Sequence, residues 1–306
     1  MKSDKNLLAE LIRGMRSAYR SGENAMAYAR ANLDAAGESV NSTVATLIAY
    51  DLQAGTYVAR ARNDPAFNRD WCRQMAGIVK PLMQQGSSLL EVGCGEATTL
   101  AGVLRELGKL EPVAYGFDIS WSRIKVANEW LKESDVCGQL FVADLFRLPM
   151  ASNSIDVVYT SHSLEPNGGK EREAIEELVR VARRYVVLVE PAYELAGEAA
   201  QGRMLHHGYV KGLRDAAIAC DVEVLDHRPL PVTPNPMNPS GVLVLKKRQV
   251  DDPAATTLWR CPVTDTSLRE NGDAFVSDDA GLAYPILGGI PLLRAEHAVV
   301  ASLLCR

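Results

Sequence analysis

The sequence predicts an α/β protein built on a doubly wound sheet of seven strands. Between residues 85 and 248, short apolar runs alternate with helix-like segments, which is typical of parallel strands covered by helices on both faces. The preceding residues read as helices, and the segment that follows is short, turn-rich and β-like. At 306 residues, the chain is long enough for more than one compact region. We therefore expect a helical region or lid over 1–84, the sheet domain over 85–248 and a small β-rich module over 257–296.

The composition is that of an ordinary globular protein, with 47% hydrophobic and 23% charged residues. The net charge is −5 and no segment concentrates Lys and Arg, which argues against a nucleic-acid partner. No stretch approaches the ~20 apolar residues that span a bilayer. Six cysteines are scattered without a Cys-x-x-Cys pair, as expected of reduced thiols. These features predict a soluble, cytoplasmic protein without a membrane partner.

The helices of the first region are predicted by spacing and composition. Leu8, Leu11, Ile12 and Met15 lie at amphipathic helical intervals rather than in the continuous apolar run of a signal peptide. An alanine-rich segment over 25–31 favours a second helix.

The elements of the sheet domain follow in order. Seven strands are expected at 88–92, 113–117, 139–142, 155–159, 185–189, 220–226 and 241–246. Three helices are expected at 97–108, 120–132 and 170–182. Residues 246–253 read as a polar linker, and Asn271-Gly272-Asp273 as a turn in the module beyond it.

A Gly-x-Gly turn follows the first strand and precedes a helix. Such a turn lets a ligand approach the backbone at the carboxyl edge of the sheet. Thr98 stands where a dinucleotide fingerprint needs a third small residue, and the lysine of a phosphate-binding loop is missing. Glu91 lies two residues before Gly93, where a carboxylate would repel a pyrophosphate. The motif therefore favours a ligand that carries positive charge.

Four segments in order resemble the motifs of class I S-adenosylmethionine-dependent methyltransferases. They are Glu91–Gly95, Gly116–Ser120, Val142–Leu145 and Ser154–Tyr159. The resemblance covers roughly residues 85–246 and implies a Rossmann-like fold, S-adenosyl-L-methionine as cofactor and S-adenosyl-L-homocysteine as product.

The resemblance also implies which residues bind the cofactor. They are Glu91, Gly93, Cys94, Gly95, Asp118, Ile119, Asp144, Leu145 and Ser161. A carboxylate at Asp118 can accept hydrogen bonds from the ribose hydroxyls, and Asp144 can accept one from the adenine amino group. Either aspartate could instead be a helix cap or turn residue, and Cys94 reads as a buried spacer rather than a nucleophile.

Acidic and histidine side chains follow the fourth and fifth strands, where many class I members bind the acceptor. We expect His162, Glu165 and Glu190 to be catalytic, because paired acids beside histidine suit a cationic or amine acceptor. The alternatives are that the glutamates bind loop amides or cap helices, and that His162 is a satisfied core residue.

The expected acceptor-binding residues come from three places. They are Tyr50, Asp51, Tyr57, Asn167 and His207. The first three interleave polar and aromatic groups, as in a lid over a small-molecule pocket. A helix that merely packs its aromatic side chains on the sheet is the alternative.

The acceptor class follows from the same loop. Nucleic-acid and glutamine N-methyltransferases carry an Asn/Asp-Pro-Pro-aromatic motif after strand four, whereas this chain has Glu165-Pro-Asn167. A loose resemblance to the double-glutamate loop of protein arginine methyltransferases points to amine chemistry. We therefore expect methyl transfer to a small molecule, at an amine or guanidinium nitrogen or at an oxygen. The alternatives are an RNA or translation-protein methyltransferase and a catalytically silent cofactor-binding regulator.

The C-terminal segment Leu258–Leu293 resembles the small zinc-ribbon-like activator subunit of tRNA, rRNA and release-factor methyltransferases. The zinc-binding form of that family has two Cys-x-x-Cys pairs. Here Cys261 alone remains, with Thr264, Ser277 and Ala280 at the other positions. One thiol cannot build a four-ligand site, so we predict no zinc. The module then acts as a scaffold, or joins two subunits of a homodimer through residues 286–293.

Overall fold

A computed structural model of the chain describes residues 4–33, 43–248 and 257–305. The described residues form two compact units, and the boundary between them in the sequence lies between Thr56 and Tyr57. This boundary lies before the expected one at residue 84. The reason is that Trp71 and Met75, which we had assigned to the helical region, are buried in the same core as the sheet.

The first unit consists of three helices with one small core. They are α1 (Asp4–Arg20), α2 (Ala25–Leu33) and α3 (Thr43–Leu52). Met15, Ala29 and Ala49 are buried between them. The two helices expected from the spacing of apolar residues and from the alanine-rich segment are therefore confirmed.

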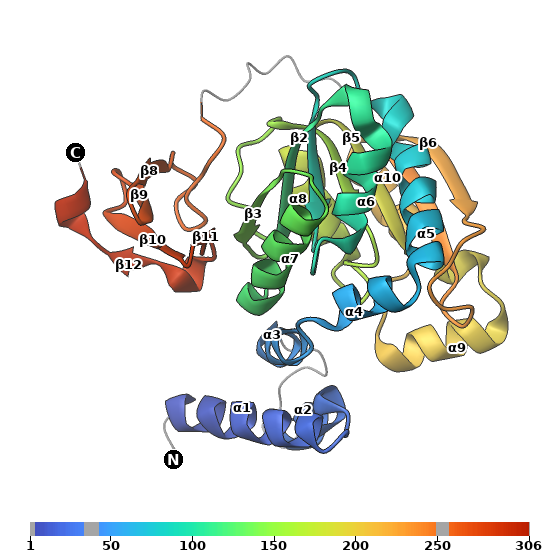
Figure 1. Cartoon of the computed structure of the whole chain (residues 1–306), viewed down its shortest axis with the longest axis horizontal. Helices are drawn as coiled ribbons and strands as arrows, with labels where there is room; N and C mark the ends of the chain where they lie inside the picture. Colours follow the sequence, from blue (N-terminus) through green and yellow to red (C-terminus); the bar gives the residue numbers. More distant parts are fainter. Residues whose placement is uncertain (1–3, 34–42, 249–256, 306) are drawn as a thin grey trace. The chain divides into compact units, whose positions relative to one another are not determined.

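The second unit contains the predicted seven-stranded sheet. Its strands are β1 (Ser88–Val92), β2 (Val113–Asp118), β3 (Gln139–Val142), β4 (Ile155–Thr160), β5 (Ala182–Pro191), β6 (Val222–Pro229) and β7 (Ser240–Lys247). The strand order is β3-β2-β1-β4-β5-β7-β6, with β1 to β5 parallel and β7 antiparallel to both of its neighbours. All seven expected strands are confirmed. Figure 1 shows this sheet, with β2, β3, β4, β5 and β6 labelled.

Helices cover both faces of this sheet. They are α5 (Pro65–Val79), α6 (Thr98–Leu107), α7 (Trp121–Glu133), α8 (Glu171–Val181) and α10 (Leu213–Ile218), and the same unit also contains α4 (Thr56–Asn63) and α9 (Glu198–His207). Short 3-10 helices lie at Lys80–Leu82, Gly108–Leu110, Tyr193–Leu195, Ala295–His297 and Ser302–Leu304. Apolar residues of α5, α6 and α7 share one buried core, and those of α8 and α10 share the other. The three helices expected from the sequence correspond to α6, α7 and α8.

The strand order reverses between β1 and β4. The chain leaves β1 toward β2 and β3, and then returns across the sheet to β4 on the other side. At such a point the loops from neighbouring strands diverge and leave a crevice outside their carboxyl ends. The carboxyl ends of β1, β2, β4 and β5, together with the loops after them, carry most of the predicted site residues.

The C-terminal module is a small antiparallel sheet. Its strands are β8 (Arg269–Asn271), β9 (Ala274–Ser277), β10 (Leu282–Leu287), β11 (Ile290–Pro291) and β12 (Val299–Val300). The predicted turn lies between β8 and β9. The linker expected over 246–253 overlaps the end of β7, and its residues from 249 onward lie outside the described ranges.

The module attaches to the free edge of the large sheet at β3. The Leu293 N–H donates to the Val142 carbonyl (2.8 Å), and the Ala151 N–H donates to the Leu258 carbonyl (2.8 Å). Ile290 and Leu293 are buried within the unit. Part of the segment that we considered for subunit pairing is therefore used inside the chain, where it covers an edge strand that would otherwise expose unpaired backbone groups.

Within the described ranges, no helix is both long and apolar enough to cross a membrane. A cytoplasmic location stays a prediction.

Candidate active site

The Gly-x-Gly turn after β1 has a backbone that favours glycine. Gly93 and Gly95 have φ values of +59° and +55°, in the left-handed region. A Cβ atom on Gly93 would lie 2.5 Å from the Ser163 Cβ. Cys94 between them is buried and donates its N–H to the Phe117 carbonyl (2.8 Å). The turn is thereby fixed against β2, and Cys94 is a spacer, as the sequence indicated.

Asp118, at the end of β2, is tied to this turn. Its Oδ2 accepts a hydrogen bond from the Gly95 N–H (3.1 Å), and its Oδ1 accepts one from the Ser120 N–H (2.9 Å). Burial raises the pKa of Asp118 above its usual range, while the backbone donors and the Arg123 charge oppose the shift. Asp118 is thus both a turn residue and a carboxylate placed beside the Gly-x-Gly backbone.

Glu91 lies beneath the turn, at 2% exposure. Burial raises the pKa of its carboxyl to about 8, although interaction with the Tyr159 hydroxyl opposes the shift. Strand β4 places Tyr159 directly beside Glu91 in the register of the sheet. A buried acid without a cationic partner suits a ligand that brings the positive charge itself.

Asp144 begins the loop after β3. Its Oδ1 accepts a hydrogen bond from the Phe146 N–H (2.9 Å), so the turn alternative holds for this residue. Leu145 packs partly buried against the core beside it. A role for Asp144 at the adenine amino group and the part of Ile119 in binding stay predictions.

The loop after β4 is organised around Glu190, at the end of β5. Glu190 Oε1 accepts hydrogen bonds from the N–H groups of Ser163 and Leu164 (both 3.1 Å), and Oε2 accepts one from the Glu165 N–H (3.0 Å). The carboxyl is buried, and burial raises its pKa to about 7 while the His162 charge opposes the shift. We expected Glu190 to face the acceptor. The structure instead has it bind loop amides, because both oxygens are used beneath the loop.

His162 and Glu165 form a hydrogen-bonded pair in the same loop. His162 Nδ1 lies 2.8 Å from Glu165 Oε2, and His162 Nε2 lies 2.7 Å from the Ser240 hydroxyl. Both ring nitrogens therefore have partners within the protein. A direct contact of His162 with the acceptor stays a prediction. Glu165 keeps 18% of its side chain exposed.

Residues from distant parts of the chain surround the His162–Glu165 pair and form the His162 cluster with it. Burial acts to raise the pKa of Glu165, but hydrogen bonding and charge from His162, with Tyr209 and Asn238, lower it overall. The pKa of Tyr209 is raised to about 12, by burial and by the nearby Glu165 charge. The Trp71 ring packs edge-on against His162 at 5.8 Å. The sequence did not reveal Trp71, Asn238 or Ser240, since no local pattern relates them to the loop.

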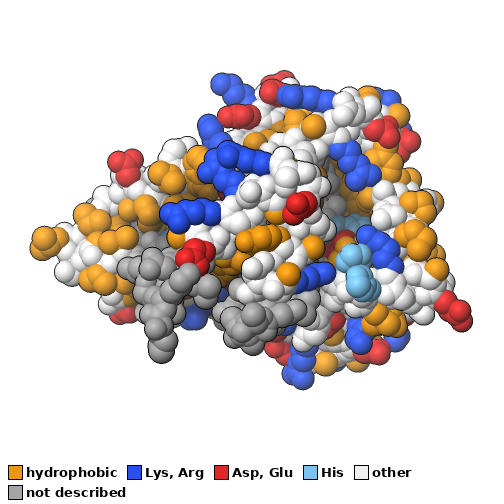
Figure 2. Space-filling view, turned by 90° about the horizontal axis from the view of Figure 1, so that it is seen from below, with side chains coloured by type: hydrophobic (Ala, Val, Ile, Leu, Met, Phe, Trp, Pro, Cys, Tyr) orange, Lys and Arg blue, Asp and Glu red, His pale blue; other side chains and the backbone are white. Residues whose placement is uncertain are grey.

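The other predicted residues around this loop are placed differently. Asn167 donates its side-chain N–H to the Leu164 carbonyl (3.3 Å), so it braces the loop. His207 stacks on Tyr209 at 5.3 Å, which brings it to the edge of the cluster. Ser161 is half-buried directly after β4. Histidine side chains gather at one place on the face shown in Figure 2, with acidic and basic groups around them.

The three aromatic and acidic residues of the expected lid are divided between the two units. Tyr57 lies on α4 in the second unit, where two of its ring carbons would be 3.3 Å from a Cβ atom on Gly95. It therefore borders the Gly-x-Gly turn. Burial raises the pKa of Tyr57, and the nearby Asp118 and Glu165 charges raise it further while Arg123 opposes the shift. Tyr50 and Asp51 lie on α3 in the first unit, and their role at the acceptor stays a prediction.

The module has a hydroxyl network around the positions where the sequence resemblance implied zinc-binding thiolates. Cys261 Sγ lies 3.2 Å from the Tyr284 hydroxyl, and the Thr266 hydroxyl lies 2.8 Å from those of both Thr264 and Ser277. Across the described part of the chain, no three His, Cys, Asp or Glu side chains are grouped to hold a metal. The absence of zinc stays a prediction.

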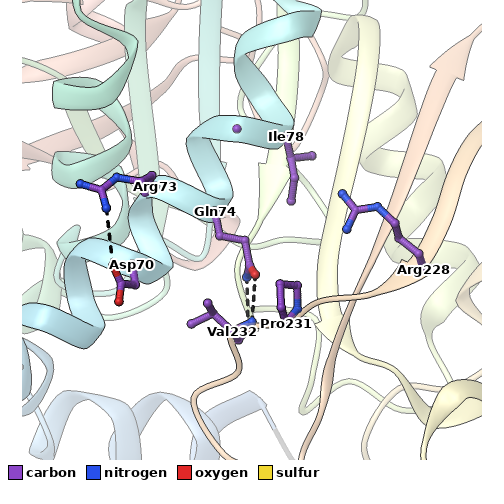
Figure 3. A pocket seen from close by; sticks show the side chains of 8 residues that line it. Asp70, Arg73, Gln74, Ile78, Arg228, Pro231 and Val232 are labelled. Atoms are coloured by element: carbon purple, nitrogen blue, oxygen red, sulfur yellow. Dashed lines mark hydrogen bonds and ion pairs between the residues drawn. The ribbon is translucent and has the colours of Figure 1, made fainter.

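A surface pocket of about 480 Å³ lies apart from these residues, between α5 and the segment after β6 (Figure 3). It contains Arg73 and Arg228, which pair with Asp70 (3.6 Å) and Asp226 (2.9 Å). Gln74 closes one side by exchanging two hydrogen bonds with the Val232 backbone (3.0 Å each). No predicted site residue lines it.

The residues at the ends of β1 and β2 fit S-adenosylmethionine. Gly93 and Gly95 present backbone without side chains at the end of β1, Asp118 offers carboxylate oxygens beside it, and buried Glu91 suits a cationic group. These are the groups that an ammonium, a sulfonium and a ribose diol require.

Comparisons with known proteins agree with this arrangement. Residues 89–184 match the family described as "Methyltransferase domain". Magnesium protoporphyrin IX methyltransferase from Synechocystis PCC 6803, solved with bound SAH, has the same fold: the TM-score is 0.50 at 16% identity, over 66% of this chain and 99% of that one.

Two further matches are a methyltransferase–activator complex and a short UPF0434 protein. One is a structure of the Haloferax volcanii Trm112 methyltransferase activator in complex with a methyltransferase; the matched chain has a TM-score of 0.50 at 13% identity, over 64% of this chain and 96% of that one. The other is a UPF0434 protein of Maricaulis maris, 41% identical over 49 residues, which is 15% of this chain and 78% of that protein. The chain is therefore an S-adenosylmethionine-dependent methyltransferase with a Rossmann-like fold, whose residues 89–184 match the methyltransferase family, and a 49-residue stretch of it belongs to the UPF0434 family.

Proposed function

We propose that the enzyme methylates a small molecule at an amine or guanidinium nitrogen, and that Glu165 is the side chain that meets this nitrogen. The observation that carries the proposal is the position of Glu165. It lies on the loop whose Ser163 occupies the space beside Gly93, it is partly exposed, and His162 holds it at 2.8 Å.

The charge on Glu165 explains why a nitrogen suits this place. Its lowered pKa keeps it ionised at neutral pH. S-adenosylmethionine, when bound, supplies a methyl group activated by a sulfonium. Positive charge then develops on an attacking neutral amine, and a carboxylate already fixed nearby stabilises that charge without having to reorganise. The Glu165 carboxylate can also accept the proton that the methylated nitrogen releases.

His162 and Glu190 act through the loop. His162 orients the Glu165 carboxylate, and its second ring nitrogen is anchored on buried Ser240 at the start of β7. Glu190 binds three consecutive amides of the loop and so fixes its path. Both are positioning residues in this proposal.

Transfer of a labelled methyl group to panels of amine, hydroxyl and carboxyl acceptors tests the proposal. We expect turnover with amines, and loss of that turnover in Glu165→Gln while S-adenosylmethionine still binds. Turnover confined to hydroxyl acceptors would contradict nitrogen chemistry and favour O-methylation. Transfer to tRNA but not to a metabolite extract would favour the RNA alternative, and binding without any transfer would favour a silent regulator.

For the C-terminal module we propose a supporting role within the same chain. Its attachment along β3 supports this, as does the resemblance of residues 258–293 to an activator subunit that other methyltransferases bind as a separate protein. Sedimentation at two protein concentrations tests the homodimer: a concentration-independent monomer would restrict the module to this intramolecular role.

A further inference from the structure

Two opposite charges are buried next to the Gly-x-Gly turn. Arg123 on α7 is 1% exposed and Glu96, just after Gly95, is 0% exposed. Arg123 Nη1 lies 3.4 Å from Glu96 Oε1. Burying such a pair gains little stability over apolar residues of similar volume, because both charges lose their hydration. Core stability alone therefore does not account for this pair.

Helix α4 is attached to this pair at its first turn. The Val58 N–H donates to Glu96 Oε2 (2.7 Å), so the carboxylate satisfies one of the amides that a helix N-terminus leaves without an internal partner. The Arg123 guanidinium carbon lies 4.2 Å from the centre of the Tyr57 ring, which is the geometry of a cation–π contact. Both members of the pair thus hold the same turn of α4.

Tyr57 is consequently fixed over Gly95. A Cβ atom on Gly95 would lie 3.3 Å from two Tyr57 ring carbons and 3.7 Å from Arg123 Nη1. The N–H of the same glycine donates to Asp118, the expected ribose ligand. Tyr57 nevertheless remains 43% exposed, so part of its surface is free to contact a ligand at the turn.

We propose that Tyr57 is a cofactor-contacting residue and that Glu96 and Arg123 are positioning residues that hold it against S-adenosylmethionine. The first turn of α4 thereby becomes a wall of the methyl-donor site. This assigns Tyr57 to the cofactor rather than to the acceptor, where the sequence had suggested it. The assignment does not depend on which acceptor is methylated.

Calorimetric titration of S-adenosylmethionine and S-adenosylhomocysteine tests the contact without any acceptor. Tyr57→Ala should weaken the binding of S-adenosylmethionine about tenfold or more, whereas Tyr57→Phe, which keeps the ring, should remain within about threefold of the wild type. Asn63→Ala, at the exposed end of the same helix, is the matched control and should bind as the wild type does. Unchanged binding by Tyr57→Ala would overturn the proposal.

The charged pair needs a second design, because Arg123→Met alone leaves Glu96 buried without its cation. In the double variant Glu96→Gln/Arg123→Met both charges are gone, and we expect it to melt at a higher temperature than Arg123→Met. Its affinity for S-adenosylmethionine should nevertheless stay about tenfold below the wild type. A double variant that folds and binds the cofactor as tightly as the wild type would show that the pair is merely structural.

Discussion

Gly93 and Ser163 lie so close together that no side chain fits on Gly93. A Cβ atom on Gly93 would lie 2.5 Å from the Ser163 Cβ. Gly93 belongs to the cofactor turn after β1, and Ser163 belongs to the loop that carries Glu165. This close approach of Ser163 to Gly93 therefore links the methyl-donor site to the proposed acceptor site.

Gly93→Ala should weaken cofactor binding and displace the loop that carries Glu165. The added methyl group must displace the Ser163 loop, and it also meets a φ of +59°, which L-residues rarely adopt. We expect cofactor affinity to fall about tenfold or more, by the cost of a strained backbone. Gly77→Ala on α5, where nothing lies within 4 Å of the new Cβ, is the control and should raise stability by about 0.5–1 kcal/mol. Calorimetry and thermal melting of both variants measure these effects, and equal cofactor affinity in the two would contradict the steric argument.

Asp118→Asn should lower cofactor affinity while leaving the fold intact. The amide keeps one acceptor oxygen, but its NH₂ group would oppose the N–H of either Gly95 or Ser120. The loss of a charge-assisted acceptor is worth about 1.5–3 kcal/mol, which is roughly a tenfold to hundredfold weaker Kd. Asp221→Asn, in an exposed pair with Arg248, is the control. A wild-type Kd in Asp118→Asn would remove this residue from the cofactor site.

Substitutions of Glu165 and Glu190 should have different effects, one on kcat and the other on the melting temperature. Glu165→Gln should lower kcat for an amine acceptor by about 10²-fold, because a charge poised for the transition state is lost. Its melting temperature should stay close to that of the wild type. Glu190→Gln should instead lower the melting temperature, since the three loop amides share a weaker acceptor. If Glu190→Gln were as stable as the wild type but inactive, Glu190 would be catalytic after all.

The buried acid Glu91 predicts a pH dependence of stability. Its pKa of about 8 in the folded state lies above its ordinary value of 4.5, so the folded protein binds the proton more tightly than the unfolded chain. This contribution is present in full below about pH 4.5 and is lost as the pH rises toward about 8. Each pKa unit corresponds to about 1.4 kcal/mol, so the loss should reach a few kcal/mol.

Denaturant titrations at pH 5 and pH 8 measure this dependence. Glu91→Gln should flatten it, and the exposed Glu223→Gln on β6 should not. Binding of S-adenosylmethionine near neutral pH should release a proton from the Glu91 carboxyl, because the positive charge of the ligand favours the ionised form of this residue. Identical pH profiles in the wild type and Glu91→Gln would show that another group carries the dependence.

Ile290→Ala should show how much the module supports the large sheet. Ile290 is buried in the core that contains α6 and α7, so removing its methylene and methyl groups should cost about 2–5 kcal/mol. We expect the melting of the whole second unit to shift as one transition. Leu287→Ala, at an exposed position of the same module, is the control. A separate low-temperature transition confined to the module would contradict the supporting role.

The sequence by itself determined the sheet and the cofactor turn. Apolar strands alternating with amphipathic helices locate β1 to β7 and α6 to α8, because burial imposes a local period on each element. Gly93, Gly95 and Asp118 are recognisable because their roles depend on the backbone a few residues away. The antiparallel direction of β7 was not predictable, since a buried strand has the same apolar pattern in either direction.

Only the tertiary structure decided which side chains meet. The pairing of β5 with β7 brings Ser240 to His162, 78 residues away along the chain. The turn after β1 brings Glu96 to Arg123, although an arginine in the first turn of a helix reads as exposed. The sequence predicted Glu190 as a catalytic acid, whereas the structure shows that its carboxylate binds three backbone amides. Such contacts depend on loop paths and on long-range packing, which no local periodicity of the sequence encodes.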